Sequence, residues 1–442
     1  MVQPEIRIEA RKPGIIAGQD NHIEALIRIR VPALPETAVP SRPALNLAFV
    51  IDRSGSMSGH PLREACQSTM EMLKRLAPRD RAAIIVYDDK ADTLVPSRPV
   101  DDVGFFQRAL RMITSGGSTN LHGGWEQGCR AIESQVSKET ISRVLLLSDG
   151  RANTGIDDPR KIATAVAERA EAGVSTSTYG LGRDFNEDLM IDMGRRGGGR
   201  SAYGETAADL IEPYREEFAL LDATFGRQVR LRLKSAGDGA IEVVNGYERG
   251  PDGAIMLPEL AHGAETWALV RFTVPASAFA QAKEGAMFAV LEAEISFEGN
   301  DGRRQELPAT WLALPVIDAQ AWAGLQDDAL VARRAGELHA ARFQDAAIDA
   351  VERGDFVRVF KILAQARLEA KGNPWIEAIL SSLEELAAMG DGVMLVKELK
   401  FSRYQLRNRL ASHDELALYS PLAESKEAAF LRRKMRRGRK EF

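Results

Sequence analysis

The chain has 442 residues, of which 45% are hydrophobic and 27% are charged, a composition typical of a globular protein with roughly two to four domains. Its formal net charge of −5 is too small to indicate nucleic acid or a membrane surface as the partner of the whole chain. No apolar run approaches the roughly 20 residues that span a bilayer, and the N-terminal residues lack the pattern of a secretory signal. We therefore expect a cytoplasmic protein, in which the cysteines Cys66 and Cys129 are free thiols buried in helices.

The first 43 residues alternate apolar and polar side chains over Glu5–Ala10 and His22–Val31, which predicts β-strands. Four prolines then predict an extended connector: Pro32, Pro35, Pro40 and Pro43. We expect the strands of residues 1–43 to form part of a β-sandwich.

From residue 44 to 220, short apolar runs alternate with stretches of helical length. The predicted strands are Leu45–Ile51, Ala82–Tyr87, Arg143–Leu147 and Val174–Gly180. The predicted helices are Pro61–Leu76, Val103–Ile113, Gly124–Val136, Pro159–Ala172, Glu187–Gly194 and Ala207–Leu220. This alternation predicts an α/β domain with a doubly wound, mostly parallel sheet that is covered by helices on both faces.

Residues 221–316 change to alternating strands separated by Gly, Asp and Pro, which predicts an all-β sandwich unit. Its predicted strands are Gln228–Leu233, Ala240–Val244, Thr266–Val274, Ala286–Phe297 and Glu306–Leu314. If they pair with the strands of residues 1–43, the α/β domain is inserted in a β-sandwich. Two separate β-segments are the alternative.

Residues 317–442 show helical periodicity and end in a basic tail. The predicted helices are Ala329–Ala341, Phe343–Arg353, Asp355–Lys371, Trp375–Met389 and Gly390–Arg409. One of them has an amphipathic recurrence over Phe356, Phe360, Leu363, Ala366 and Ala370. The region could be a docking platform or a packing domain. The tail around Leu431–Lys440 is a solubilising end or, alternatively, a site for an acidic partner such as nucleic acid.

Three polar segments carry the chemistry of the chain. Asp52-Arg53-Ser54-Gly55-Ser56 follows one predicted strand directly, and Ser148-Asp149-Gly150 follows another. Gly116-Gly117-Ser118-Thr119-Asn120 forms a loop between helices. The carboxyl ends of parallel strands are the edge at which open α/β sheets bind ligands. The sequence therefore predicts that these segments lie together at one edge of the sheet.

The candidate ligands in these segments are all oxygens, from two carboxylates and three hydroxyls, and no His or Cys is among them. Hard oxygen ligands select Mg²⁺, Mn²⁺ or Ca²⁺ over zinc or copper. Because most of the oxygens belong to neutral hydroxyls, a bound cation stays electron-poor and attracts an anionic oxygen. The aspartate or glutamate of a protein partner is the obvious source of that oxygen.

The stretches FVIDRSGSMSG, GGSTNLHGG and LLLSDGRANTG resemble the motif set of the von Willebrand factor A (VWA) family in the order of its metal-ion-dependent adhesion site. Tyr179–Gly182 and the helix that Asn186 begins also resemble the family, so the resemblance covers roughly residues 44–220. By motif order it is nearest to bacterial VWA proteins akin to the inter-alpha-trypsin inhibitor heavy chains. It implies a Rossmann-like fold and a metal bound by Asp52, Ser54, Ser56, Thr119 and Asp149, with Ser118 as a lesser candidate.

Several other features have a structural interpretation that we prefer to a functional one. Asp88-Asp89 is interpreted as a solvated turn, with a role at the rim of the metal site as the alternative. Gly197–Gly199 lacks the pattern of a phosphate loop and predicts a flexible loop. His122 has no carboxylate or Cys at ligand spacing and is expected to be a loop or rim residue.

The sequence therefore predicts a Mg²⁺-dependent protein–protein interaction module that binds an acidic residue of its partner. HExxH, GxSxG and paired-Cys motifs are absent from the sequence, so we expect no enzymatic activity. The alternatives are an adaptor subunit of an AAA+ ATPase or chelatase-like machine and, less favoured, a Mg²⁺-dependent phosphoesterase.

Overall fold

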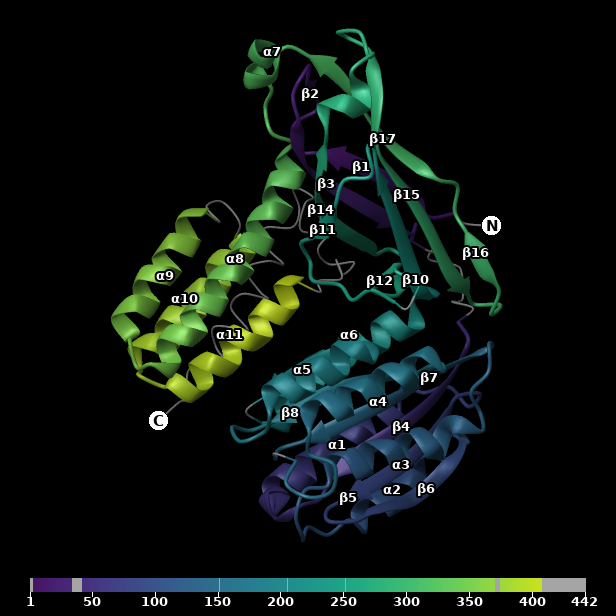
Figure 1. Ribbon diagram of the computed structural model, residues 1–442. Helices are drawn as coiled ribbons and strands as arrows, with labels where there is room; N and C mark the ends of the chain where they lie inside the picture. Colours follow the sequence, from purple (N-terminus) through teal and green to yellow (C-terminus); the bar gives the residue numbers. More distant parts are fainter. Residues whose placement is uncertain are drawn as a thin grey trace. The chain divides into compact units, whose positions relative to one another are not determined.

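The computed structural model describes residues 3–33, 42–150, 152–204, 206–250, 252–369 and 374–407 (Figure 1). The chain divides into two compact units. One contains Pro40–Ala223 and Asn300–Arg303, and the other contains Met1–Val39, Thr224–Gly299 and Arg304–Phe442. The predicted basic tail and the end of the last predicted helix lie outside the described residues.

The unit around residues 40–223 is built on one sheet, which has six strands in the described residues, in the order β6-β5-β4-β7-β8-β9. Its parallel strands are β4 (Ala44–Asp52), β5 (Arg81–Tyr87), β7 (Thr140–Ser148), β8 (Val174–Leu181) and β9 (Gly198–Gly204), and β6 (Ala91–Pro99) is antiparallel to β5. The residues of β4 and β7 are almost all buried, because central strands are covered on both faces. The predicted α/β class is confirmed.

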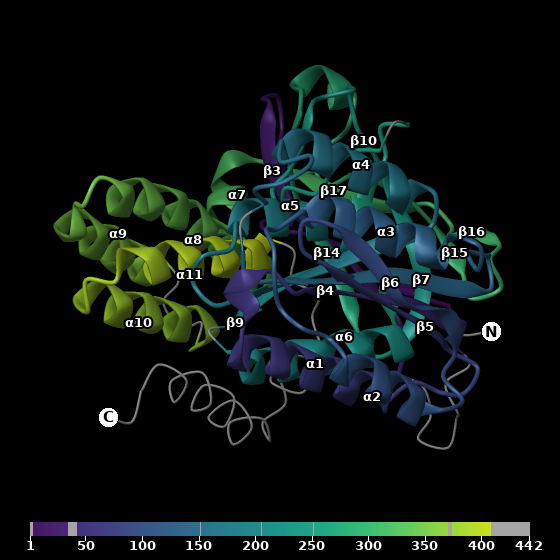
Figure 2. The same cartoon turned by 90° about the horizontal axis from the view of Figure 1, so that it is seen from below.

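Helices cover both faces of this sheet. In Figure 2, α3, α4 and α5 lie on one face and α1, α2 and α6 on the other. Their bounds are α1 (His60–Leu73), α2 (Val103–Arg111), α3 (Leu121–Glu133), α4 (Pro159–Glu171), α5 (Glu187–Arg196) and α6 (Ile211–Asp222), with short 3-10 turns η1 (Gly55–Met57) and η2 (Ala207–Leu210). Asn186 caps α5 by accepting a hydrogen bond from the Leu189 N–H, which confirms the predicted cap.

Of the two edge strands of this sheet, β6 was not predicted, and β9 was expected only as a last strand without bounds after the Gly197–Gly199 loop. β6 is an edge strand with several exposed side chains, so it lacks the apolar run of the central strands. The flexible loop predicted at Gly197–Gly199 is wrong from Gly198 on, where β9 begins. A Cβ on Gly199 would lie 2.3 Å from the Thr176 carbonyl oxygen, so glycine lets β9 approach β8.

The second unit contains two sheets whose inner faces share one hydrophobic core. In the part of the chain that is described, the smaller sheet has the order β1-β3-β14-β11 and the larger one follows β12-β10-β15-β17-β2, with β13 beside β10 and β16 beside β15. The bounds are β1 (Glu5–Ala10), β2 (Ile15–Ile16), β3 (Asn21–Arg30), β10 (Thr224–Ser235), β11 (Ile241–Val243), β12 (Ile255–Leu257), β13 (Leu260–Ala261), β14 (Glu265–Val274), β15 (Met287–Gly299), β16 (Arg304–Glu306) and β17 (Thr310–Ile317). A single strand predicted over Glu306–Leu314 is wrong, because Pro308, which has no N–H, separates β16 from β17.

Strands from before and after the α/β unit pair with each other. β3 is antiparallel to β14 along ten residue pairs from Glu265↔Arg30 to Val274↔Asn21, and β2 is parallel to β17. In sequence, therefore, the α/β unit lies between two segments that share the sheets of the sandwich.

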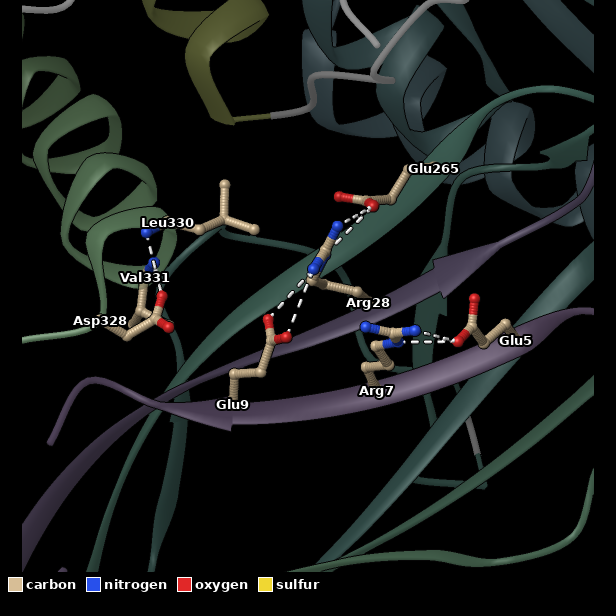
Figure 3. A network of polar contacts seen from close by, with 8 residues as sticks. All are labelled: Glu5, Arg7, Glu9, Arg28, Glu265, Asp328, Leu330 and Val331. Carbon is tan, nitrogen blue, oxygen red and sulfur yellow. Dashed lines mark hydrogen bonds and ion pairs between the residues drawn. The ribbon is translucent and has the colours of Figure 1, made fainter. Parts of the chain in front are cut away.

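The outer face of the smaller sheet carries an apolar patch and a charged one. Leu26, Trp267 and Leu269 are buried against Val331, Ala335 and Leu338 of helix α8 (Ala329–Glu352). Farther along β3, Arg28 donates to Glu265 at 2.7 Å and to Glu9 at 3.2 Å (Figure 3). The same view shows the Asp328 carboxylate accepting hydrogen bonds from the N–H groups of Leu330 and Val331, which begins α8.

After the short helix α7 (Ala319–Gly324), the C-terminal region packs α8, α9 (Phe356–Glu369), α10 (Pro374–Ala388) and α11 (Gly392–Arg407) around a core of their own. Two predicted helices, Ala329–Ala341 and Phe343–Arg353, are one helix of 24 residues, since no helix-breaking residue separates them. Phe360 is 40% exposed, so its predicted place on the buried stripe of α9 is wrong. No helix in the described ranges is long and apolar enough to cross a membrane.

Candidate metal centre

Asp52 lies at the carboxyl end of β4 and is fully buried. Its Oδ1 accepts a hydrogen bond from the Ser54 N–H at 2.9 Å, and its Oδ2 accepts from the Ser148 hydroxyl at 2.7 Å and the Tyr87 hydroxyl at 3.2 Å. Burial raises the pKa of Asp52, although the hydrogen bonds from Ser54, Ser148 and Tyr87 oppose that shift. These donors are neutral, so they orient the carboxylate without cancelling its charge.

A chain of oxygens runs from Ser54 to Asp149. The Ser54 and Ser56 hydroxyl oxygens are 3.2 Å apart in the turn that begins η1, and the Ser56 hydroxyl donates to Asp149 Oδ1 at 2.8 Å. Burial raises the pKa of Asp149 to about 6; the Ser56 hydrogen bond opposes this shift and the charge of Asp52 adds to it. The two carboxylates thus lie on either side of the two serines, in surroundings that disfavour negative charge.

Thr119 belongs to the same cluster and is 4% exposed. Its Oγ1 is 3.2 Å from the point that a Cβ on Gly150 would occupy, and the Ser56 hydroxyl oxygen is 3.9 Å from the same point. Glycine at position 150 therefore leaves space between Thr119 and the turn of Ser54–Ser56, which is called the serine turn below. Ser118, the lesser candidate, is exposed and is linked through its N–H to Asp89 instead.

The turn at Asp88-Asp89 is bonded to the loop of Gly116–Asn120, which carries Thr119 and is called the threonine loop below. Interpreting this turn as only a solvated turn is therefore wrong. Asp89 Oδ1 accepts from the Ser118 N–H at 2.6 Å, and the Asp88 carbonyl accepts from the Asn120 N–H at 2.8 Å. The Asp88 carboxylate also accepts from Arg53 Nε at 2.9 Å. The sequence showed two acidic residues after a strand, but not which loop they would meet.

Backbone contacts join the threonine loop to the serine turn. The Gly116 N–H donates to the Arg53 carbonyl at 2.8 Å, and the Gly55 N–H donates to the Gly117 carbonyl at 3.1 Å. Glycines at these positions let two main chains approach closely. The loops that carry Thr119 and Ser54–Ser56 are therefore held together by backbone hydrogen bonds.

Sequence reasoning missed three residues of this site: Ser148, Tyr87 and Asn153. Ser148 and Tyr87 donate to Asp52, and Asn153 is bonded to the backbone of Thr119. Ser148 was visible in the Ser148-Asp149-Gly150 segment, and Tyr87 ends the strand next to β4, where it is paired with Asp52. Asn153 lies within the stretch LLLSDGRANTG, but nothing in that stretch pointed to a contact with Thr119.

The donor set fits a hard divalent cation. Two carboxylates and three hydroxyls converge there, and their oxygens are the ligands that Mg²⁺, Mn²⁺ and Ca²⁺ prefer. Among the described residues, no group of three or more His, Cys, Asp or Glu side chains is placed to hold a metal. A cation in this part of the chain would therefore depend on hydroxyls as well as carboxylates.

The remaining candidates from the sequence, His122 and the two cysteines, have surroundings that indicate packing rather than chemistry. His122 is in the first turn of α3, its ring centroid 5.7 Å from that of Trp125, and burial lowers its pKa. Burial raises the pKa of Cys129 to about 12 and that of the half-buried Cys66 to about 11. Neither thiol is activated as a nucleophile.

The geometry describes a doubly wound α/β domain with an oxygen-lined site at the carboxyl edge of its sheet. Residues 46–213 match the family model of the von Willebrand factor type A domain, so this chain contains a VWA domain. Two curated relatives are similar over this region. YfbK of Escherichia coli is 31% identical over 194 residues, which is 43% of this chain and 34% of that protein. Human inter-alpha-trypsin inhibitor heavy chain H4 is 30% identical over 162 residues, 34% of this chain and 17% of that protein.

Solved structures are similar over nearly the whole chain as well. A von Willebrand factor type A protein from Catenulispora acidiphila superposes with a TM-score of 0.70 at 15% identity, covering 90% of this chain and 97% of that one. This likeness concerns the fold, and it extends beyond the VWA domain. The chain spans about a third of YfbK and less than a fifth of heavy chain H4, so it shares only a part of these curated relatives.

Proposed function

We propose that this chain is a divalent-metal-dependent protein-binding module. Asp52, Ser54, Ser56, Thr119 and Asp149 would hold Mg²⁺ or Mn²⁺, and the partner would contribute the carboxylate of an aspartate or glutamate. The observation that carries the proposal is a set of contacts: Asp52 accepts from the Ser54 N–H, the hydroxyls of Ser54 and Ser56 lead to Asp149, and Thr119 and Ser56 both lie close to Gly150. Both carboxylates are in surroundings that disfavour their charge.

Each residue has a role that its contacts support. Asp52 supplies a buried charge that Ser148 and Tyr87 keep oriented, and Asp149 supplies a second charge nearer the surface. Ser54, Ser56 and Thr119 supply neutral oxygens, so the protein offers few negative charges to the site. When bound, the cation supplies a positive centre that attracts an anionic oxygen from the partner.

A binding role fits the site better than catalysis. Of the two carboxylates among the proposed ligands, Asp52 is fully buried and bonded to three donors, and Asp149 accepts from Ser56. Both are already assigned to the cation. We therefore propose a site that recognises a carboxylate rather than one that hydrolyses a phosphoester.

The test is affinity capture from native lysate with the full chain. Wild type in Mg²⁺ is compared with wild type in EDTA, with Asp149→Ala, and with Asp157→Ala, an exposed aspartate later in the same loop. We expect a partner that wild type and Asp157→Ala retain in Mg²⁺ and that is lost in EDTA and with Asp149→Ala. Replacing acidic residues of that partner should then identify one carboxylate whose loss abolishes binding. The same partners in every arm would contradict the proposal.

A further inference from the structure

We propose that Asn153 is a positioning residue for the metal site, because it ties the loop that carries Asp149 to the loop that carries Thr119. This inference rests on the proposed function. Asn153 lies in the loop between β7 and α4, four residues after Asp149. Thr119 lies just before α3, on a separate segment of the chain.

Asn153 occupies both backbone hydrogen-bonding groups of Thr119. Its side-chain Oδ1 accepts from the Thr119 N–H at 2.8 Å, and its own N–H donates to the Thr119 carbonyl at 3.1 Å. A pair of bonds in opposite directions restrains both the position and the rotation of the threonine peptide units. The direction in which the Thr119 hydroxyl leaves the backbone is therefore set by a residue of the Asp149 loop.

A second contact between the same two loops supports this interpretation. Gly155 has a φ of +76°, and a Cβ on it would lie 2.5 Å from Asn120 Oδ1. Asn120 in turn caps α3 by accepting from the Gly123 N–H at 2.9 Å. The Asp149 loop thus packs against Asn120 as well as Thr119, through Gly155 and Asn153.

Positioning is needed here because a threonine hydroxyl is a weak ligand and Mg²⁺ demands near-ideal octahedral geometry. The Thr119 hydroxyl must lie close to Ser56 and Asp149, which belong to other segments of the chain. Asn153 is itself exposed, so its side chain is not part of the hydrophobic core. Its removal should free Thr119 without unfolding the domain.

The experiment measures Mn²⁺ affinity of the full chain by electron paramagnetic resonance. Asn153→Ala should weaken binding by about tenfold, as loss of a residue that orients metal ligands commonly does. Asn153→Asp keeps an acceptor for the Thr119 N–H and should bind within a few fold of wild type. Because aspartate also adds charge, the double variant Asn153→Ala, Thr154→Asp adds that charge without the acceptor, and it should stay weak.

The matched control is Asn186→Ala, which removes the asparagine cap of α5, a hydrogen bond to the Leu189 N–H rather than to the backbone of Thr119. It should lower the melting temperature of the metal-free protein yet leave Mn²⁺ affinity unchanged, which separates positioning from general stability. Wild-type affinity in Asn153→Ala, or equal weakening in Asn186→Ala, would overturn the inference while leaving the proposed function standing. If wild type binds neither Mn²⁺ nor Mg²⁺, both the inference and the proposed function fail.

Discussion

Ser148 and Asp52 lie on the neighbouring strands β7 and β4, and the Ser148 hydroxyl donates a 2.7 Å hydrogen bond to Asp52 Oδ2. Ser148→Ala removes this donor from a fully buried carboxylate. We expect the metal-free protein to lose about 1.5–3 kcal/mol in its free energy of unfolding, the usual worth of a hydrogen bond to a charged group. Urea unfolding in EDTA measures the change, and unchanged stability would mean that Asp52 does not depend on Ser148.

Asp149→Asn should make the metal-free protein more stable while removing its response to Mg²⁺. Burial and the charge of Asp52 raise the pKa of Asp149 to about 6, so ionising this carboxyl is less favourable in the folded state than in the unfolded state. The amide keeps an acceptor for the Ser56 hydroxyl. We expect a gain of about 1 kcal/mol after allowance for solvent screening at this half-buried position. Thermal unfolding of wild type and variant, with EDTA and with Mg²⁺, tests both parts. A variant that melts below wild type in EDTA would contradict the first part, and a variant that Mg²⁺ still stabilises would contradict the second.

Gly117→Ala should disturb the threonine loop directly. Gly117 has a φ of +75°, and a Cβ there would lie 2.1 Å from Asp89 Oδ1. The backbone strain alone costs roughly 1–2 kcal/mol for a residue other than glycine. We expect lower stability and weaker Mn²⁺ binding in the variant. Adding Asp89→Ala should relieve the collision but neither the backbone strain nor the loss of the hydrogen bond from the Ser118 N–H to Asp89, so recovery will be partial at most. Full recovery would show that only the collision matters.

The free energy of unfolding should depend on pH through the buried ion pair of Arg42 and Asp80. Arg42 donates from both terminal nitrogens to the two Asp80 oxygens at 2.7 Å, and Asp80 is fully buried. Burial raises the pKa of Asp80, but the Arg42 hydrogen bonds and the N–H groups of Leu45 and Ala77 outweigh it, so the net shift is downward.

Because the folded-state pKa is lowered, the stabilising contribution of Asp80 is complete above the unfolded pKa of about 4 and is lost as pH falls through the folded value. Asp80→Asn should destabilise the protein at pH 7 by less than the roughly 3–5 kcal/mol of a fully uncompensated buried charge, since it leaves the buried Arg42 guanidinium with the exposed Asp222 as its remaining counter-charge. The difference in unfolding free energy between wild type and variant should shrink below about pH 4. An equal difference at pH 3 and pH 7 would contradict this assignment.

The sequence was sufficient to predict the fold class and the gathering of the proposed ligands. Asp52 ends β4 and Asp149 follows β7, and these strands are neighbours in the sheet, so their carboxyl ends meet. The structure links Ser54, Ser56 and Asp149 through hydrogen bonds and places Thr119 beside them. Their role in holding a metal stays a prediction.

The remaining parts of the site depend on strand register and loop conformation. Tyr87 reaches Asp52 because β4 and β5 pair these two residues, which no pattern within either strand specifies. Asn153 meets Thr119 through two loops that are far apart in the sequence. Edge strands such as β6 were missed for a related reason, because one exposed side removes the apolar run that marks a central strand.

The most direct test of the central claim is equilibrium dialysis of Mn²⁺ and Mg²⁺ against the full chain. Wild type is compared with Ser54→Ala, Ser56→Ala as a double variant and with Ser58→Ala, an exposed serine just beyond η1, as the control. We expect saturable binding of one ion per chain in wild type and in the control, and its loss in the double variant. Saturable binding that survives in the double variant, or no binding by wild type, would contradict a metal-dependent function at this site.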